Sequence, residues 1–315
     1  MPGWNDLLNE TKAAGSTHDV IRRRYLRRLQ ELTGRNVIVY YSGWLQKQEL
    51  ARQGFTGFAV NDSDKNAFMA TIHGLNRNLG LDLVLHTPGG ETAATESLVD
   101  YLHAMFGKDI RAIVPQLAMS AGTMIALACR EVVMGKHSSL GPIDPQLAGM
   151  AAHGVIEEFN RAKLEIAGDP AKGIAGNPAM IPIWQPIIAK YSPTLIGECE
   201  KAIEWSNEIV QKWLKDYMFD GAPDKDANAK RIIDELSDHA LTKSHARHYS
   251  AEQALSLGIK VTQLEDDQAL QDAVLSVHHT MIQTLDATGA YKIVENHEGV
   301  AYIQQLQTAL IHVRQ

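Results

Sequence analysis

The chain has 315 residues, of which 45% are hydrophobic and 21% are charged, and its formal net charge is −7 with two cysteines. This composition is that of an ordinary globular protein, and it excludes collagen-like, wholly disordered and disulfide-stapled classes. The negative charge argues against binding of nucleic acid over a broad basic surface, so no nucleic-acid partner is expected.

Neither a leader nor a membrane-spanning segment is expected from the sequence. Its first residues lack the basic region and apolar run that are typical of a leader. The longest strongly apolar stretch, Leu117–Cys129, covers 13 residues, whereas a spanning helix needs about 20. We therefore expect a soluble protein, and two cysteines fit a reducing cytoplasm.

Residues 1–35 are expected to form an amphipathic basic helix, because apolar residues recur at helical spacing from Val20 to Leu32. Residues 1–36 carry seven basic and four acidic side chains, a net charge of +3, so the rest of the chain has −10. The basic cluster Arg22–Arg28 is either the solvated face of a packed helix or a patch for an anionic membrane or nucleic acid. Peripheral membrane contact through this cluster stays open.

Four β-branched or apolar runs then alternate with helical patterns. Strands are expected at 36–41, 81–86, 109–115 and 131–134, with helices between them. This alternation predicts an α/β domain with a largely parallel sheet. Beyond it, the sequence predicts a mostly helical insertion at about 151–240, a short helix at 251–257 before a last strand, and a long helix at 266–286.

These elements suggest three parts. They are an N-terminal helix at 1–35, a catalytic domain at 36–262 that includes the helical insertion, and a helical C-terminal extension at 263–315. No internal repeat and no clear linker between domains is present.

The first candidate for chemistry is a sharp turn of small residues after the third strand, Met119-Ser120-Ala121-Gly122. Ser120 would lie at a helix N-terminus, where backbone N–H groups and the helix dipole favour a developing negative charge. The pattern differs from the G-x-S-x-G nucleophile motif, and a helix-capping serine is the simpler interpretation of the local sequence.

The second candidate is the turn His86-Thr-Pro-Gly89-Gly90, which follows the second strand. Two glycines after a strand can leave N–H groups free for the oxyanion of a tetrahedral intermediate, although an ordinary turn would look the same. If the strands are parallel, this turn and Ser120 fall at one edge of the sheet, where such folds place their sites.

Five blocks of sequence carry a resemblance to a known family. They are Arg35-Asn-Val-Ile-Val-Tyr-Tyr-Ser42, Leu81-Asp-Leu-Val-Leu-His-Thr-Pro-Gly-Gly90, Val114-Pro-Gln-Leu-Ala-Met-Ser-Ala-Gly-Thr-Met124, Met134-Gly-Lys-His-Ser-Ser-Leu-Gly-Pro-Ile-Asp-Pro-Gln146 and, more weakly, His248-Tyr-Ser-Ala-Glu-Gln-Ala-Leu-Ser-Leu-Gly258. Over most of 20–262 the chain resembles the serine dehydrogenase proteinase family, in the signal peptide peptidase A-like branch of the Clp protease/crotonase superfamily. The resemblance implies a fold of repeated ββα units with a largely parallel sheet, to which this chain adds N- and C-terminal helices.

The resemblance also implies roles for particular residues. Ser120 would be the nucleophile, and the backbone N–H groups of Gly90 and Ala121 would form the oxyanion hole, with Gly89 shaping the turn. A Clp-type histidine would fall about 25 residues after the serine, where this chain has 142–145, Pro-Ile-Asp-Pro. The aspartate of that triad would fall near His245 and Ala246, and neither is an acid.

A Ser-Lys dyad of the signal peptide peptidase A type is the alternative that the resemblance offers. Its lysine would lie about 50 residues after the serine, and Lys172 lies 52 residues after Ser120. A lysine base must be largely neutral near pH 7, so its pKa must be lowered by burial. Lys163, Lys190 and His137 remain rival bases, and the sequence does not decide among them.

Other groups of residues are weaker candidates for a functional site. His86 is expected to be structural, although it could line the site. The spacing of His239, His245 and His248 matches no zinc motif, so no metal is expected. Neither a P-loop nor a dinucleotide fingerprint is present, so no cofactor is expected.

The sequence therefore predicts a cytoplasmic, ATP-independent serine peptidase that acts on peptide or protein substrates by a Ser-Lys acyl-enzyme mechanism. The resemblance implies a homo-oligomer. Two alternatives stay open. The first is a non-catalytic oligomeric scaffold or pseudopeptidase, and the second is a crotonase-type enzyme that uses only the oxyanion hole on acyl-thioesters.

Overall fold

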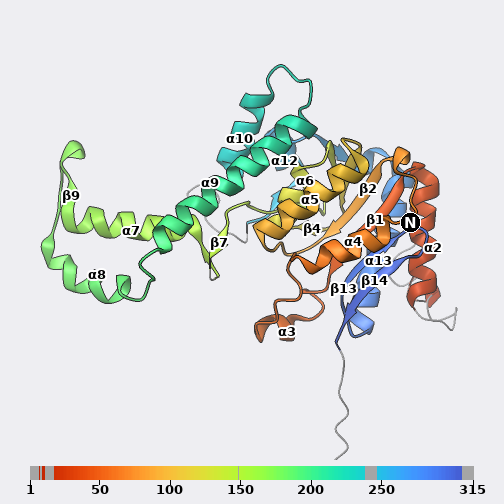
Figure 1. Cartoon of the computed structure of the whole chain (residues 1–315), viewed down its shortest axis with the longest axis horizontal. Coiled ribbons are helices and arrows are strands. Elements are labelled where there is room, and N and C mark those ends of the chain that lie inside the picture. Colours follow the sequence, from red (N-terminus) through yellow and green to blue (C-terminus); the bar gives the residue numbers. More distant parts are fainter. Residues whose placement is uncertain (1–6, 8, 11–17, 148, 238–246, 307–315) are drawn as a thin grey trace, which may run out of the picture.

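The computed structural model of the chain describes residues 7, 9–10, 18–147, 149–237 and 247–306. Its centre is a seven-stranded sheet in the order β12-β5-β3-β2-β1-β13-β14, with helices on both faces (Figure 1). The strands are β1 (Asn36–Ser42), β2 (Leu81–His86), β3 (Ile110–Val114), β5 (Glu131–Met134), β12 (Val261–Gln263), β13 (Ala290–Asn296) and β14 (Ala301–Gln305). The first five are parallel to one another, and β13 is antiparallel to both of its neighbours.

Two apolar layers hold the sheet, because alternate side chains of a strand point to opposite faces. Residues Val37, Val39 and Tyr41 of β1 pack toward α2 (His18–Thr33) and α13 (Gln268–Ala287). Ile38 and Tyr40 belong to the larger core on the other face. That face carries α4 (Ser63–Ile72), α5 (Thr92–Phe106), α6 (Ala121–Leu127), α10 (Lys225–Ser237) and α12 (Ala251–Ser256).

Short elements complete the body. A three-stranded sheet consists of β4 (Leu117–Ala118), β6 (Ser139–Leu140) and β11 (Tyr249–Ser250). The remaining pieces are α3 (Gln48–Arg52) and the 3₁₀ turns η1 (Arg77–Leu79) and η5 (Leu264–Asp266).

An arm projects from this body (Figure 1). It begins with the hairpin of β7 (Gln146–Leu147) and β8 (Met150–Ala151), runs out along α7 (Ala152–Ala167) and turns at the hairpin of β9 (Gly168–Asp169) and β10 (Ile174–Ala175). It returns through α8 (Ile181–Ile188) into α9 (Leu195–Trp213) and the π turn η4 (Leu214–Met218), with 3₁₀ turns η2 (Pro170–Lys172) and η3 (Pro178–Met180) at its tip. A small cluster of Ala152, Val155, Leu195 and Cys199 packs α7 against α9.

The predicted α/β architecture is confirmed, and the four predicted strands correspond to β1, β2, β3 and β5. The helical insertion is also present, although half of it forms the arm. The expectation of a wholly helical extension over 263–315 is wrong, because β13 and β14 join the central sheet. The strand β13 carries two buried charges, Lys292 and Glu295, which mask its apolar pattern, and both are paired from other elements, by Asp64 and Arg22.

The basic N-terminal helix differs from expectation in one respect. Arg22 is fully buried and pairs with Glu295 and with Asp19, so it is part of the packing against β13 rather than of a surface patch. The exposed basic face of α2 consists of Arg23, Arg24, Arg27 and Arg28. No helix among the described residues is long and apolar enough to cross a membrane.

Candidate active site

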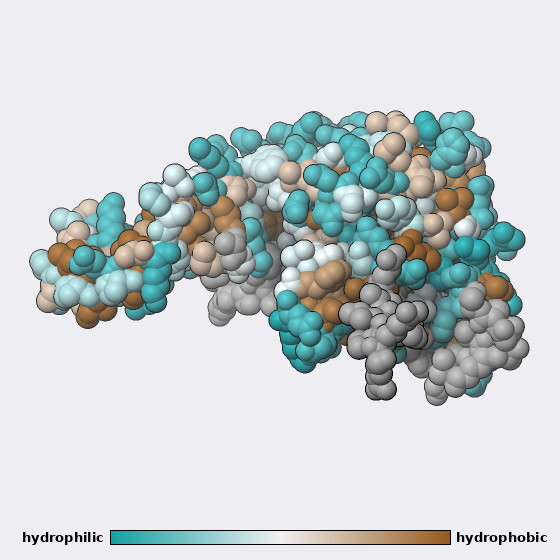
Figure 2. Space-filling model, turned by 60° about the horizontal axis from the view of Figure 1, so that its bottom comes forward, coloured by the Kyte–Doolittle hydropathy of each residue, from teal (hydrophilic) through white to brown (hydrophobic). Residues whose placement is uncertain are grey.

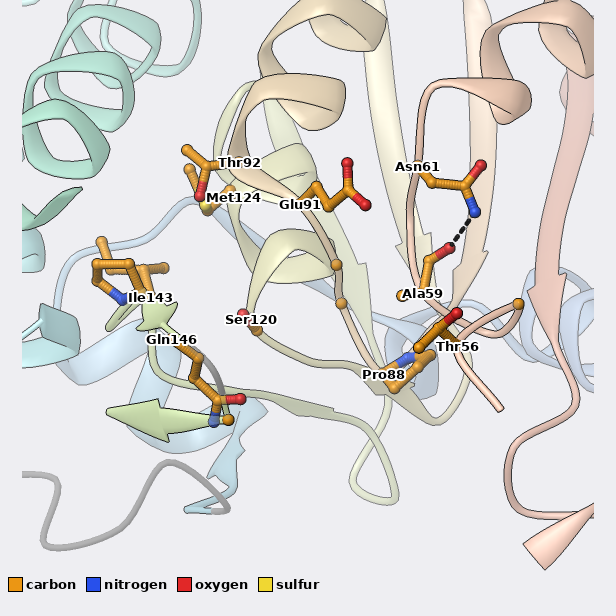
Figure 3. A pocket seen from close by; sticks show the side chains of 15 residues that line it. Thr56, Ala59, Asn61, Pro88, Glu91, Thr92, Ser120, Met124, Ile143 and Gln146 are labelled. Carbon is orange, nitrogen blue, oxygen red and sulfur yellow. Dashed lines mark hydrogen bonds between the residues drawn. The ribbon is translucent and has the colours of Figure 1, made fainter. Parts of the chain in front are cut away.

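A pocket of about 650 Å³ opens at the carboxyl ends of β2 and β3, where Ser120 lies (Figure 3). Four segments form its walls: the loop before α4, the turn after β2, the turn that leads into α6, and the stretch from the loop after β6 into the β7–β8 hairpin. The residues that line it are Thr56, Gly57, Ala59, Asn61, Pro88, Gly89, Gly90, Glu91, Thr92, Ser120, Met124, Ile143, Pro145, Gln146 and Gly149.

Ser120 stands in a strained backbone conformation, with φ 49° and ψ −115°. It is the only non-glycine residue with positive φ in the described part of the chain. Such strain persists only where the surrounding structure enforces it, and it is concentrated at functional sites. Its hydroxyl forms no hydrogen bond with any described residue, and it faces the pocket at the N-terminus of α6. The residue is therefore more than a helix cap, since no capping bond is present.

Close backbone packing enforces this conformation. Thr87 pairs with Ala118, and the Met119 N–H donates to the Thr87 carbonyl at 3.0 Å. A Cβ at Gly122 would lie 2.5 Å from Thr87 Cγ2, so only glycine fits there. The Thr123 hydroxyl donates to the Ala118 carbonyl at 2.7 Å, which ties α6 back to the turn. The run of small residues in the sequence is thus required by packing.

Gly89 leaves the space beside Ser120 open. Its φ is 102°, a conformation that residues with a side chain rarely adopt. A Cβ there would lie 2.7 Å from Ser120 Cβ and 3.0 Å from the Ala121 nitrogen. Without a side chain at this position, both the hydroxyl-bearing carbon and the Ala121 amide can be approached from the pocket.

Gly90 is fixed by a partner that the sequence did not reveal, Val60. The Val60 N–H donates to the Gly89 carbonyl at 2.8 Å, and the Glu91 N–H donates to the Val60 carbonyl at 2.9 Å. In such a parallel bridge the N–H of the intervening residue points away from its partner. Neither the Gly90 N–H nor the Ala121 N–H has an acceptor among the described residues. Two unsatisfied donors therefore flank Ser120.

The opposite wall comes from the Leu-Gly-Pro-Ile-Asp-Pro-Gln block. A Cβ at Gly141 would lie 3.1 Å from the Ser120 nitrogen, so this loop packs directly on the turn. Ile143 lines the pocket, and the next residue, Asp144, is buried and bonded through Oδ1 to Nδ1 of His153 at 2.8 Å. This pair joins the pocket wall to the root of the arm.

The predicted lysine is not part of this constellation. Lys172 lies in the tip of the arm, beside β9, with its side chain 75% exposed and its Nζ 3.4 Å from Oδ2 of Asp169 (Figure 1). The rivals Lys163, Lys190 and His137 are also exposed, and none of them lines the pocket. Within one chain the structure brings together Ser120, Gly89, Gly90 and Ala121, and no lysine among the described residues lines the pocket beside them.

His86 lies behind the site rather than in it. Its ring is fully buried against Trp44, Tyr41 and His278, with ring centroids 4.4, 5.3 and 5.4 Å away. Burial lowers its pKa to about 3, so it is neutral at pH 7. Neither ring nitrogen has a hydrogen-bond partner in the described structure. His86 therefore has a packing role under the turn.

The histidines considered for a metal lie partly outside the described residues, which exclude 238–246 and hence His239 and His245. Over the part of the chain that the structure describes, no group of three or more histidine, cysteine or acidic side chains is arranged to hold a metal ion.

Comparison with known proteins agrees with the fold. A family described as ClpP-like SDH-type serine proteinases matches residues 9–175, which include Ser120, the Gly89–Gly90 turn and Lys172. An uncharacterised protein of Methanocaldococcus jannaschii is 26% identical over 253 residues, 77% of this chain and 75% of its own length. A second uncharacterised protein of that organism is 31% identical over 165 residues, 50% of this chain and 55% of its own length.

Proposed function

Because the chain belongs to the family of ClpP-like SDH-type serine proteinases, we propose that it is an ATP-independent serine peptidase whose nucleophile is Ser120. The observation that carries the proposal is the strained serine at the pocket, with two backbone N–H groups beside it that have no acceptor. Preorganised donors of this kind stabilise an oxyanion without reorganisation during the reaction.

The reaction follows from this arrangement. Ser120 Oγ attacks the carbonyl carbon of the scissile peptide bond while a base takes its proton, and the carbonyl oxygen becomes an oxyanion. The N–H groups of Gly90 and Ala121 donate to that oxygen. The C–N bond then breaks, the base returns the proton to the leaving amine, and water hydrolyses the acyl-enzyme by the same steps.

For the base we propose Lys172 of a second copy of the chain. The arm of each chain carries Lys172 away from the body (Figure 1), so Lys172 would reach a Ser120 of another protomer. Burial in a partner's pocket would disfavour the charged form of the ammonium, as a lysine base requires.

The surface of the arm supports this assembly. Ile174, two residues beyond Lys172, is 42% exposed, and Ile181 and Ile183 on α8 are 46% and 54% exposed. Hydrophobic residues lie along the surface of the arm in Figure 2. Apolar side chains gathered on a projecting element favour a protein contact, so the proposed enzyme is a homo-oligomer in which each arm reaches a neighbouring pocket.

Hydrolysis of a mixed peptide library by the assembled protein tests the proposal. Ser120→Ala should lower kcat/KM by about a thousandfold or more, because no other group can form the acyl-enzyme. Ser256→Ala, at an exposed serine on α12, is the matched control and should keep full activity. Equal hydrolysis by both variants would contradict the proposal, and activity on an acyl-coenzyme A thioester instead would favour the crotonase-type alternative.

A further inference from the structure

Glu91 is the only residue with an ionisable side chain among the described residues that line the pocket. It directly follows Gly90, one of the two proposed oxyanion donors, and it precedes α5. Its backbone is firmly held, because its N–H donates to the Val60 carbonyl at 2.9 Å and its carbonyl accepts from the Thr95 hydroxyl at 2.7 Å. The side chain therefore starts from a fixed point beside the reacting atoms.

The Glu91 carboxylate has no partner within the described structure. It is exposed, it makes no ion pair, and it forms no capping bond at the start of α5. Figure 3 shows the Glu91 carboxylate pointing toward the side of the pocket where Asn61 lies, away from Met124 and Ile143. Asn61 forms no hydrogen bond with it in the described structure: the Asn61 side-chain oxygen accepts from Ser63, and one N–H of its amide donates to the Ala59 carbonyl.

The wall of the pocket across from this charge is apolar (Figure 3). Met124 of α6 and Ile143 of the loop before β7 form it, together with Pro145. A lysine or arginine side chain has both an aliphatic part that can contact the apolar wall and a positive charge that can pair with Glu91. Its aliphatic stem packs on apolar surface, and its charged head reaches a carboxylate at the edge.

Resting on the proposed peptidase function, we infer that the substrates are peptides with lysine or arginine next to the scissile bond, and that Glu91 is the residue that selects them. The carboxylate attracts a basic side chain and repels an acidic side chain at the same position of the substrate. A single residue therefore favours one class of peptide and disfavours the other. An exposed ion pair contributes little free energy, so a preference of about three- to tenfold is expected.

The test measures how fast peptidyl diphenyl phosphonates modify Ser120, by mass spectrometry of the assembled full-length protein. Three reagents differ only at the side chain next to the phosphorus, which mimics that of lysine, norleucine or glutamate.

The lysine reagent should react about three- to tenfold faster than the norleucine reagent. This ratio of rates should decrease between about 0.05 and 0.5 M salt, because salt screens exposed charges. Glu91→Gln should bring the ratio close to one while the norleucine rate changes less than about twofold. Glu91→Lys should make the glutamate reagent the faster of the charged pair.

Asp100→Asn is the matched control, because it removes an exposed acid from the same helix, α5, outside the pocket. It should keep the wild-type ratio. A ratio of one in the wild type, a ratio that survives in Glu91→Gln, or an equal loss for all reagents in that variant would overturn the inference. A simple alkyl fluorophosphonate separates the two claims. If it modifies Ser120 while the lysine preference is missing, only the inference fails, and if it does not modify Ser120, the proposed function fails as well.

Discussion

Ser120 has φ 49°, and the chain packs closely around the turn that contains it. Gly89, Gly122 and Gly141 each place backbone where a side chain would collide with the turn or its support. The free energy of this strain is offset by pairing of the chain around Thr87 and Ala118. A nucleophile fixed in this way needs no rearrangement before it attacks.

A methyl group at Gly89 should therefore disable the site. Gly89→Ala places a Cβ 2.7 Å from Ser120 Cβ, so the turn must shift, and activity should fall by about a hundredfold or more. Gly74→Ala is the control for the backbone effect alone, since Gly74 has φ 84° and nothing within 4 Å of the new atom. It should cost about 1 kcal/mol of stability and no activity. Equal activity of the two variants would show that Gly89 does not shape the site.

His86 gives the fold a pH dependence. Its pKa is about 3 in the folded chain because burial disfavours the imidazolium, against about 6.5 when unfolded. The unfolded chain binds the proton more strongly, so stability is complete above pH 6.5 and falls as the pH drops toward 3. At pH 5 this amounts to about 2 kcal/mol.

The variant His86→Phe keeps an aromatic ring among Trp44, Tyr41 and His278 but cannot take up a proton. Urea unfolding at pH 7.5 and pH 5 should show that the variant gains about 2 kcal/mol relative to wild type on going to the lower pH. An unchanged difference between the two proteins at both pH values would mean that His86 is not the titrating group.

Among the structural elements, the arm contributes least to the fold, yet it supplies the base in the proposed mechanism. Near its tip, the backbones of the outgoing and returning segments are in close contact. A Cβ at Gly168 would lie 2.4 Å from the Gly176 nitrogen. Residues 170–175 beyond this contact are exposed and take no part in a core. In the proposed enzyme, the hairpin that bears Lys172 serves a contact with a second copy of the chain.

Joining 168 directly to 176 removes this hairpin with little strain. The melting temperature should change by less than about 3 °C, since no core residue is lost. Peptidase activity should fall as far as in Lys172→Ala, whereas Lys190→Ala, at another exposed lysine of the arm, should stay active. A shortened protein that remains both folded and active would place the base elsewhere.

The elements near the site could be predicted because their signals are local. Strand β2 and its Gly-Gly turn, and the small-residue turn at Ser120, are each contained in about ten residues. The pairing of Val60 with Gly90 could not be predicted, because an isolated bridge has no periodicity. Strand β13 was missed because its buried charges find partners on α2 and α4, and one sequence does not show such distant pairs.

In the proposed assembly, one chain supplies the serine and another supplies the lysine. Equimolar Ser120→Ala and Lys172→Ala proteins, mixed and reassembled, should recover about a quarter of wild-type activity, since random pairing reunites both groups at that share of sites. The control mixes Lys172→Ala with the double variant that carries both Ser120→Ala and Lys172→Ala. This mixture contains no Lys172 and should stay inactive. If the first mixture also stays inactive after subunit exchange is demonstrated, a base from a second copy is ruled out.

Ser120 as nucleophile is the central claim, and a fluorophosphonate tests it most directly. The assembled protein is treated with the reagent and the modified residue is located by mass spectrometry, with Ser120→Ala in parallel. We expect one adduct per chain, on Ser120, which the Ser120→Ala variant lacks and which forms much more slowly in Lys172→Ala. A folded, assembled protein that forms no adduct, or forms it at another serine, would contradict the account.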